Sequence, residues 1–467
     1  MKNYILFIFI ATILVGCTSK QEVVDFDAVF DEMTMITNHE QNNLIEGTPF
    51  VIQEFSQSKI TCELPKGFNP LKKSEKWYCG WGNDEAFYEG GCENIAENIA
   101  ISKNEITIGN QKRGRKPPKK GQKIVFWRFI TSNFNQFTKK PIINPKLWPE
   151  FSGESVSFGG VAFSENDKRW YMVLNECDTS KMQTYLASSI DLIHWTQENN
   201  GKPILTSTDF KNCNWAGFDG YGNKQSAMVS DLHLHNGKWI LIMDGYNKAG
   251  QRSIGYGTCS SFTEKIQIAA NPILSPGKMG SWYDRSVFYG KIEKINDEFI
   301  LFFDGSNQKR FEKVGIIRTK NIYDWSTSVP TIVIDNHTGW RSSPYTSEPN
   351  MIEKRGDSIL LYVAGSKALN NSPYARITNS MNKSVSGNVD DAQIGCYLSV
   401  DNCKSFKPHK NNPVFVNNYL NPYENEHMGG NFSLIKTDTS HFIIYQAKSS
   451  KGVLRYNIMI REKKLMH

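Results

Sequence analysis

In the last two thirds of the chain, hydrophobic residues occur in short runs, and each run follows residues that are typical of a turn. Each run has five or six residues, is rich in aromatic and β-branched side chains, and comes within three residues of Asn, Asp or Gly. Such runs are typical of buried β-strands, and no long segment has apolar residues at the 3.6-residue period of a helix. The runs are Arg169–Leu174, Lys238–Met243, Glu298–Phe303, Ser358–Val363 and His441–Tyr445.

A second motif recurs after the third strand of each unit. Ser188–Trp195 matches Arg318–Trp325, and Leu398–Phe406 is a looser copy. Asp in such motifs caps turns, so we interpret these Asp residues as structural. Copies of a strand meander at roughly 50–80 residues are typical of radial β repetition. The pattern therefore predicts an all-β chain with a five-bladed β-propeller over residues 151–467; a two-sheet sandwich is the alternative.

The first residues form a targeting signal. The apolar run from Tyr4 to Val15 follows Lys2 and is shorter than the ~20 residues of a membrane-spanning helix. It ends in Leu14-Val15-Gly16-Cys17, which resembles the bacterial lipobox. The resemblance implies a signal peptide over residues 1–16, lipidation of Cys17, a tether over residues 17–50 and a lipid-anchored protein of the bacterial cell envelope, at the outer membrane or cell surface. An ordinary signal peptide is the alternative.

Residues 51–150 are predicted to be a β-rich extension that packs on the propeller or completes it. They include the basic segment Lys112–Lys123, where Pro and Gly exclude a helix. This loop either contacts an anionic polysaccharide or lipid head groups, or is a solvated hairpin loop.

Composition narrows the class of protein. Of 467 residues, 39% are hydrophobic and 12% aromatic, which excludes intrinsic disorder. The net charge of +7 is mild and much of it lies in one run, so nucleic-acid binding is not indicated.

Eight cysteines remain besides Cys17. In an exported protein this even number permits disulfides, within Cys62, Cys79 and Cys92 and between Cys396 and Cys403. No CxxC pair is present, so a metal site is not expected.

Carboxylates stand near the start of the first strand in three successive repeats. They are Asp231, Asp284 and Glu348, and the last repeat has His427 near the matching place. First strands line the centre of a propeller, where a carboxylate must be solvated, paired or used. We therefore expect these side chains to converge on one cavity.

At this point the residues resemble a known superfamily. Glu348–Asp357 resembles the segment around the general acid of five-bladed β-propeller glycoside hydrolases, the superfamily of families 43, 32, 62, 117 and 130. His427–Ser433 is similar to the His-Gly segment near the channel axis of family 43. Two departures stand out: the first repeat has Gly159 where family 43 has its base, and Asp284 is followed by Arg285 instead of Pro.

The resemblance implies a glycoside hydrolase that uses carboxylate acid/base catalysis with inversion. It makes Glu348 the acid, Asp231 the base and Asp284 the carboxylate that tunes the acid's pKa. The residues expected to bind substrate are His427, Arg285, Trp282, Arg341 and Asn431, with the arginines meeting an anionic group and Trp282, or alternatively Trp215, stacking on a sugar.

The expected partner is a neutral or anionic oligo- or polysaccharide. No nucleic-acid partner is expected, and the chain is expected to be a monomer. No cofactor is expected. A structural calcium ion near the channel axis, held by His427 or its neighbours, is the one exception considered. Two alternatives remain open: a carbohydrate-binding propeller that has lost the chemistry, which the missing carboxylate of the first repeat favours, and a glycoside phosphorylase.

Overall fold

The structure is a computed structural model. It describes residues 50–56, 59–62, 77–82, 90–93, 99–102, 105–108, 119–128, 135–136, 140–145, 148–153, 155–177, 182–335, 341, 347–365, 393–409, 412, 414–415, 427–448 and 456–464. Cys17, the signal segment and residues 112–118 of the basic loop lie outside these ranges. In the described part of the chain, no helix is long and apolar enough to cross a membrane.

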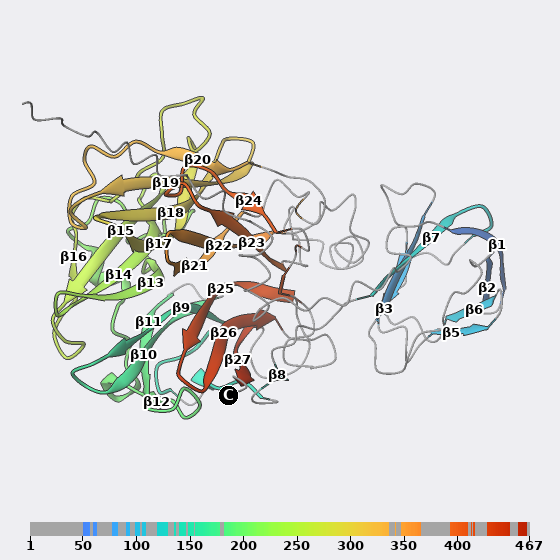
Figure 1. Cartoon of the computed structure of the whole chain (residues 1–467), viewed down its shortest axis with the longest axis horizontal. Helices are drawn as coiled ribbons and strands as arrows, with labels where there is room; N and C mark the ends of the chain where they lie inside the picture. Colours follow the sequence, from blue (N-terminus) through green and yellow to red (C-terminus); the bar gives the residue numbers. More distant parts are fainter. Residues whose placement is uncertain are drawn as a thin grey trace, which may run out of the picture.

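From residue 155 onward the strands form antiparallel meanders (Figure 1). The first contains β9 (Ser155–Ser164), β10 (Arg169–Cys177), β11 (Thr184–Ser189) and β12 (Thr196–Gln197). The second contains β13 (Met228–His235), β14 (Lys238–Tyr246), β15 (Arg252–Cys259) and β16 (Gln267–Ile268). The third contains β17 (Ser286–Ile295), β18 (Glu298–Ser306), β19 (Glu312–Thr319) and β20 (Thr331–Ile334).

Two further meanders follow. The fourth contains β21 (Pro349–Arg355), β22 (Ser358–Gly365), β23 (Gln393–Ser399) and β24 (Lys407–Pro408). The last contains β25 (His427–Lys436), β26 (Ser440–Lys448) and β27 (Tyr456–Lys464). Its outer strand is β8 (Asn135–Gln136), which pairs with Arg461 and Glu462 of β27. A segment that precedes the first meander thus completes the last sheet.

The first strands of the meanders follow one another in space. β9 contacts β13, β13 contacts β17, β17 contacts β21, and β21 contacts β25, which in turn contacts β9. One parallel bridge, Arg252 to Ser286, joins the second and third meanders. The all-β prediction is confirmed, and the predicted aromatic runs are the second strands β10, β14, β18, β22 and β26.

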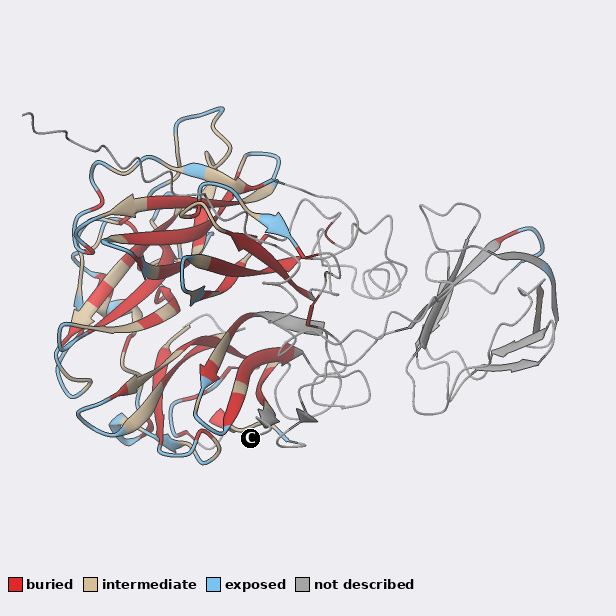
Figure 2. Ribbon diagram, in the orientation of Figure 1, coloured by how far each residue is buried: buried red, intermediate tan, exposed pale blue. Residues whose placement is uncertain are grey.

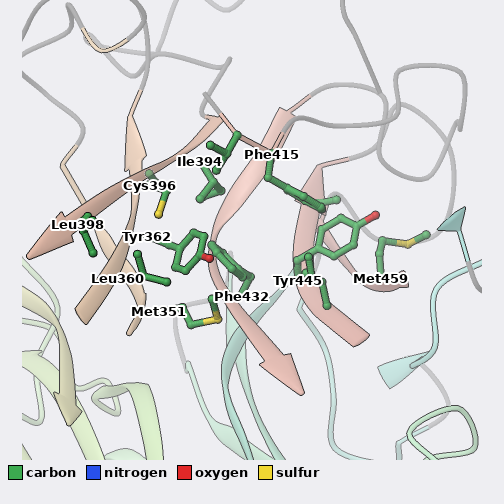
Figure 3. Packing of buried hydrophobic residues seen from close by; sticks show 14 residues of the cluster. Met351, Leu360, Tyr362, Ile394, Cys396, Leu398, Phe415, Phe432, Tyr445 and Met459 are labelled. Atoms are coloured by element: carbon green, nitrogen blue, oxygen red, sulfur yellow. The ribbon is translucent and has the colours of Figure 1, made fainter. Parts of the chain in front are cut away.

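The second strands are buried along most of their length (Figure 2). Because neighbouring meanders cover both faces, these strands read as continuous apolar runs. Between the fourth and last meanders, Tyr362 packs against Phe432 with ring centroids 5.6 Å apart, and Phe415 against Tyr445 at 5.4 Å (Figure 3). These interfaces form the cores that fix the first strands in place.

The close packing of Trp215 against Gly255 allows a test of the fold. A Cβ atom added to Gly255 would lie 2.3 Å from Cζ2 of the buried Trp215, so we expect Gly255→Ala to lower the free energy of unfolding by about 1–3 kcal/mol. Urea denaturation measures this loss. Gly220→Ala is the control, since its nearest neighbour atom lies at 3.6 Å; equal losses in both variants would contradict the prediction.

Residues 50–128 contribute a separate seven-stranded sheet, ordered β4-β3-β7-β1-β2-β6-β5. Its strands are β1 (Phe50–Ser56), β2 (Lys59–Cys62), β3 (Trp77–Gly82), β4 (Gly90–Glu93), β5 (Ile99–Ser102), β6 (Glu105–Ile108) and β7 (Lys123–Arg128). Within it Cys79 and Cys92 lie opposite each other in register. The disulfide considered between Cys396 and Cys403 is absent, since both thiols are free and buried.

Candidate active site

Irregularities of register divide the first strands into two parts. In β13 the pairing shifts between Val229 and Asp231, and β17, β21 and β25 shift at comparable places. Such bulges re-aim the side chains that follow them. We call the part before each shift, with the loop leading into it, the entrance, and the part after it the exit.

Glu348 belongs to the entrance. Its carbonyl oxygen accepts a hydrogen bond from Ala364 N at 2.8 Å, immediately before β21. The first three meanders carry no acid at the matching register, where they have Ser157, Met228 and Phe288. Only the fourth of these four first strands therefore presents a carboxylate at this level.

Polar side chains near the ends of the second strands hold the neighbouring entrance backbone. Asn175 accepts from Val229 N at 2.9 Å and donates to Val229 O at 2.8 Å. Gln446 accepts from Phe158 N at 3.0 Å. These bonds satisfy backbone groups at the entrance of the neighbouring meander.

Asp244 occupies the same position in the second meander and is paired. Its Oδ2 accepts from Tyr289 N at 3.1 Å, and its Oδ1 lies 2.5 Å from both Nε and Nη2 of Arg252. The Arg252 guanidinium also lies 4.6 Å from the ring centre of Phe288 and 5.2 Å from that of Tyr289. Burial raises the pKa of Asp244, and Arg252 opposes the rise.

The third meander replaces this ion pair with two acids. Asp304 takes the place of Asp244, and Glu312 takes the place of Arg252 in the register. Asp304 is fully buried, and its carboxyl group and that of Glu312 share a hydrogen bond. Burial raises the pKa of both groups well above the usual value, Glu312 is raised further by Asp304, and Glu348 adds to both shifts. We call Asp304 and Glu312 the acid pair; burial and mutual repulsion both favour its protonated form.

Glu348 itself lies in this cluster. Burial raises its pKa to about 7, while Arg252 lowers it and Asp244 raises it. Glu348 in turn is the main reason that the pKa of Tyr289 lies well above its usual value. A carboxyl group that titrates near neutral pH can act as a general acid at working pH.

Asp231 lies at the exit instead. It lines a cavity of about 450 Å³ together with His233, Lys291 and Glu293. Its Oδ2 lies 2.6 Å from His233 Nε2 and accepts from Ile292 N at 2.9 Å, and Lys291 Nζ is 4.0 Å from Oδ1. Burial favours a higher pKa, but His233 and Lys291 outweigh it and hold the pKa of Asp231 at about 2. Asp231 is therefore an ionised and neutralised carboxylate.

The structure does not bring Asp231 to Glu348. Asp231 stands three positions beyond Met228, the residue whose register matches Glu348; because Ser230 is bulged, this corresponds to two residues of the partner strand, or about 7 Å. The groups with the largest effects on the two carboxyls share no member. The base role predicted for Asp231 has no support in this geometry.

Asp284 does not join the cluster either. It lies in the loop before β17, where Oδ2 accepts from Gly280 N at 2.7 Å and Oδ1 from Gln308 N at 3.0 Å. Both oxygens therefore tie two loops together. Its neighbour Arg285 is half-buried, and its backbone N donates to Ser306 O at 3.0 Å.

Of the predicted substrate-binding residues, Arg341 lies nearest the acid pair. It is buried, lowers the pKa of Asp304, and its side chain is hydrogen-bonded to Tyr397. Asn431 is buried and donates to Phe158 O at 2.7 Å, a structural bond. The side chain of His427 lies outside the described residues.

The two tryptophans expected to stack on a sugar pack against the protein. Trp282 is half-buried and stacks on Phe303 at 5.5 Å, close against Gly305. Trp215 is only 1% exposed, and its indole N donates to Ala269 O at 2.9 Å. Trp215 therefore offers no face to a ligand.

Within the described residues, no group of three or more His, Cys, Asp or Glu side chains is arranged to hold a metal ion. The structural calcium ion considered near the channel axis stays a prediction, since the side chain of His427 is not described.

Comparison with known proteins returns similar structures only. No protein-family model matches the chain, and no curated protein matches it in sequence. A thermostable family-43 glycoside hydrolase is similar over 68% of this chain and 92% of its own, at 11% identity and a TM-score of 0.49. The catalytic domain of a Coprinopsis cinerea GH62 alpha-L-arabinofuranosidase is similar over 72% and 98%, at 11% identity and a TM-score of 0.48.

An endo-1,4-beta-xylanase from Bacteroides thetaiotaomicron is similar over 68% of this chain and 97% of its own, at 13% identity and a TM-score of 0.47. The similar structures thus include glycoside hydrolases of the family 43 and family 62 type, the superfamily that the sequence resembles.

Proposed function

We propose that this protein is a glycoside hydrolase whose meanders form a five-bladed β-propeller and whose chemistry lies at the entrance. The observation that carries the proposal is the state of Glu348, a carboxyl group with a pKa of about 7 beside Asp244, Tyr289 and the acid pair. Glycoside hydrolysis needs a protonated carboxyl group to deliver a proton to the leaving oxygen. Glu348 supplies that proton at neutral pH.

Glycoside hydrolysis also needs a second carboxyl group, and in this proposal the acid pair supplies it. Between its two titration steps the pair holds one proton and one negative charge, as coupled carboxyls do. Glu312 is the half-buried member and Asp304 the fully buried one, so Glu312 faces an incoming water or sugar. In this assignment the ionised carboxylate of the pair acts as the base, and the hydrogen bond between Glu312 and Asp304 holds the shared proton. Inversion of configuration remains part of the proposal.

The substrate is an oligo- or polysaccharide; Arg341 is buried, and its positive charge acts on Asp304 of the acid pair. We propose further that Cys17 anchors the chain to a bacterial membrane through lipid, which agrees with an extracellular glycan as substrate. Labelling of the protein in growing cells with a clickable fatty acid, compared with Cys17→Ala, tests the anchor.

One observation favours a second function. In the first three meanders, the register position of Glu348 holds no acid. The residues there are Ser157, Met228 and Phe288. A carbohydrate-binding protein without catalysis fits this feature.

The test is release of nitrophenol from a panel of aryl arabinosides, xylosides, galactosides and glucosides, together with reducing-sugar release from the matching polysaccharides. Turnover by the full chain supports the hydrolase. Binding to a polysaccharide on affinity gels with no release from any member of the panel establishes the binding function instead.

The raised pKa of Glu348 sets the pH dependence. Because the acid must be protonated, we expect the ionisation of Glu348 to leave kcat/KM unchanged below pH 7. Above the pKa of about 7, kcat/KM should fall about tenfold per pH unit, which is the basic limb of the profile. Initial rates across pH 5–10 on one aryl glycoside measure this limb. A basic limb that begins near pH 5, the range of an unperturbed carboxyl, would remove Glu348 as the acid.

A further inference from the structure

A second cavity lies between the first and second meanders and has a volume of about 320 Å³. The turns β9–β10 and β13–β14, which close the exit ends of their first strands, contribute Asn166, Asp167 and Gly237 to its wall. It therefore lies at the opposite end of the meanders from Glu348. Its volume is within the range of small-molecule sites.

Aromatic rings form one wall. Tyr171 and Phe262 have ring centroids 5.4 Å apart, and Trp239 packs on Phe262 at 4.9 Å. Trp239 is only 3% exposed, whereas Tyr171 and Phe262 are half-buried and offer ring surface to the cavity. A flat ring exposed in a pocket binds an apolar face whose edges carry polar groups.

Hydrogen-bond acceptors form another part of the wall, beside the hydroxyl of Tyr171. Asp167 Oδ2 accepts from Ser164 Oγ at 2.8 Å and from Tyr171 Oη at 3.2 Å. Glu198 Oε1 accepts from Ser188 Oγ at 2.5 Å and lies 3.6 Å from Arg169 Nη1. Among the described residues no donor binds the other oxygens, Asp167 Oδ1 and Glu198 Oε2.

The residues that line the cavity also indicate which ligand charge it favours. Hydroxyl donors and acceptors come from Ser260, Ser261 and Thr263, and none of the residues that line this cavity is Lys or Arg. Two carboxylates, of which only Glu198 lies near a cation, Arg169 outside the lining, favour hydroxyl donors over anionic groups.

We propose that this cavity is a second carbohydrate site, which holds one neutral sugar unit with its ring against Tyr171 and Phe262 and its hydroxyls on Asp167 and Glu198. The site is independent of the chemistry proposed for Glu348. It would retain a glycan on the protein while another part of the same glycan, or of a neighbouring chain, occupies the entrance.

The test uses the full chain carrying Glu348→Gln, so that no probe is consumed, and isothermal titration with xylotetraose, arabinotetraose, cellotetraose and galactotetraose. Tetragalacturonate is the anionic comparison. We expect at least one neutral probe to bind, and Glu198→Gln and Phe262→Ala each to weaken that binding by about tenfold.

Two variants are matched controls. Glu298 pairs with Arg318 at 3.2 Å and has a similarly exposed side chain to Glu198, at 35% against 32%. Tyr323 is a partly exposed aromatic residue of the third meander that packs on Tyr256. Glu298→Gln and Tyr323→Ala should leave the affinity within about twofold.

The results that would overturn the second site differ from those that would overturn the hydrolase proposal. No binding of any neutral probe, tighter binding of tetragalacturonate, or binding that both Glu198→Gln and Phe262→Ala leave unchanged would each overturn the second site. Glu198→Gln keeps the packing intact, so it decides the matter if Phe262→Ala does not fold. Absence of turnover in the aryl glycoside panel would leave this binding result untouched.

Discussion

Glu348→Gln is expected to lower kcat/KM on glycosides with alkyl leaving groups by about two to four orders of magnitude, the range of a lost general acid. The amide keeps the shape and hydrogen bonding of the side chain but has no proton to give. A nitrophenolate leaves without help from an acid, so the loss on aryl glycosides should be smaller. The measurement is kcat/KM on paired methyl and nitrophenyl glycosides of one sugar.

Asp231→Asn is the comparison variant, since Asp231 lies at the exit and is neutralised by His233 and Lys291. It should keep the ratio of alkyl to aryl rates of the wild type. Equal losses on both leaving groups in Glu348→Gln would assign Glu348 to substrate binding. A selective loss in Asp231→Asn would restore Asp231 to the chemistry.

Arg252→Gln is expected to lower the free energy of unfolding by about 3–5 kcal/mol, because it leaves the buried Asp244 without its cation. Arg318→Gln removes the more exposed pair with Glu298 and should cost about 0–1 kcal/mol. Urea unfolding at pH 7 measures both. Addition of Asp244→Asn to Arg252→Gln should recover part of the loss, since the remaining side chains are neutral. A loss in Arg252→Gln no larger than in Arg318→Gln would contradict the role of the ion pair.

The strands of this protein could be predicted from sequence because each second strand is covered on both faces. Burial on both faces selects a continuous apolar run, and Lys238–Met243 and Ser358–Val363 carry that signal without help from distant residues. The turn Asp residues were equally readable: Asp191 accepts from the backbone N of Ile193 and His194, so its role is local.

The site depends on contacts that cross between meanders, which no local pattern records. Asp304 and Glu312 stand on the second and third strands of one meander, whereas Glu348 precedes the first strand of the next. A search confined to first strands could find Glu348 but not its neighbours. The one available signal was the Asp-Gly pair that ends an apolar run, at Asp244 and again at Asp304.

Asp231 was misplaced for a physical reason. β13 and β21 each carry one extra residue, Ser230 and Asn350, so Asp231 takes the register of Met351, three residues beyond Glu348, and sequence alone does not show this alignment. Asp284 was misplaced because the loop before β17 is long enough to put its carboxylate among backbone N–H groups instead of at the centre.

The pairing of β8 with β27 has a consequence for how the protein is made. Asn135–Gln136 leaves the ribosome before any meander exists, whereas its partner strand β27 follows the other strands of all five meanders. Until β27 has been synthesised, the last sheet has an unpaired edge, and unpaired edges recruit strands from other chains. Deletion of the first 136 residues should therefore give a shortened protein that folds its meanders but self-associates along β27.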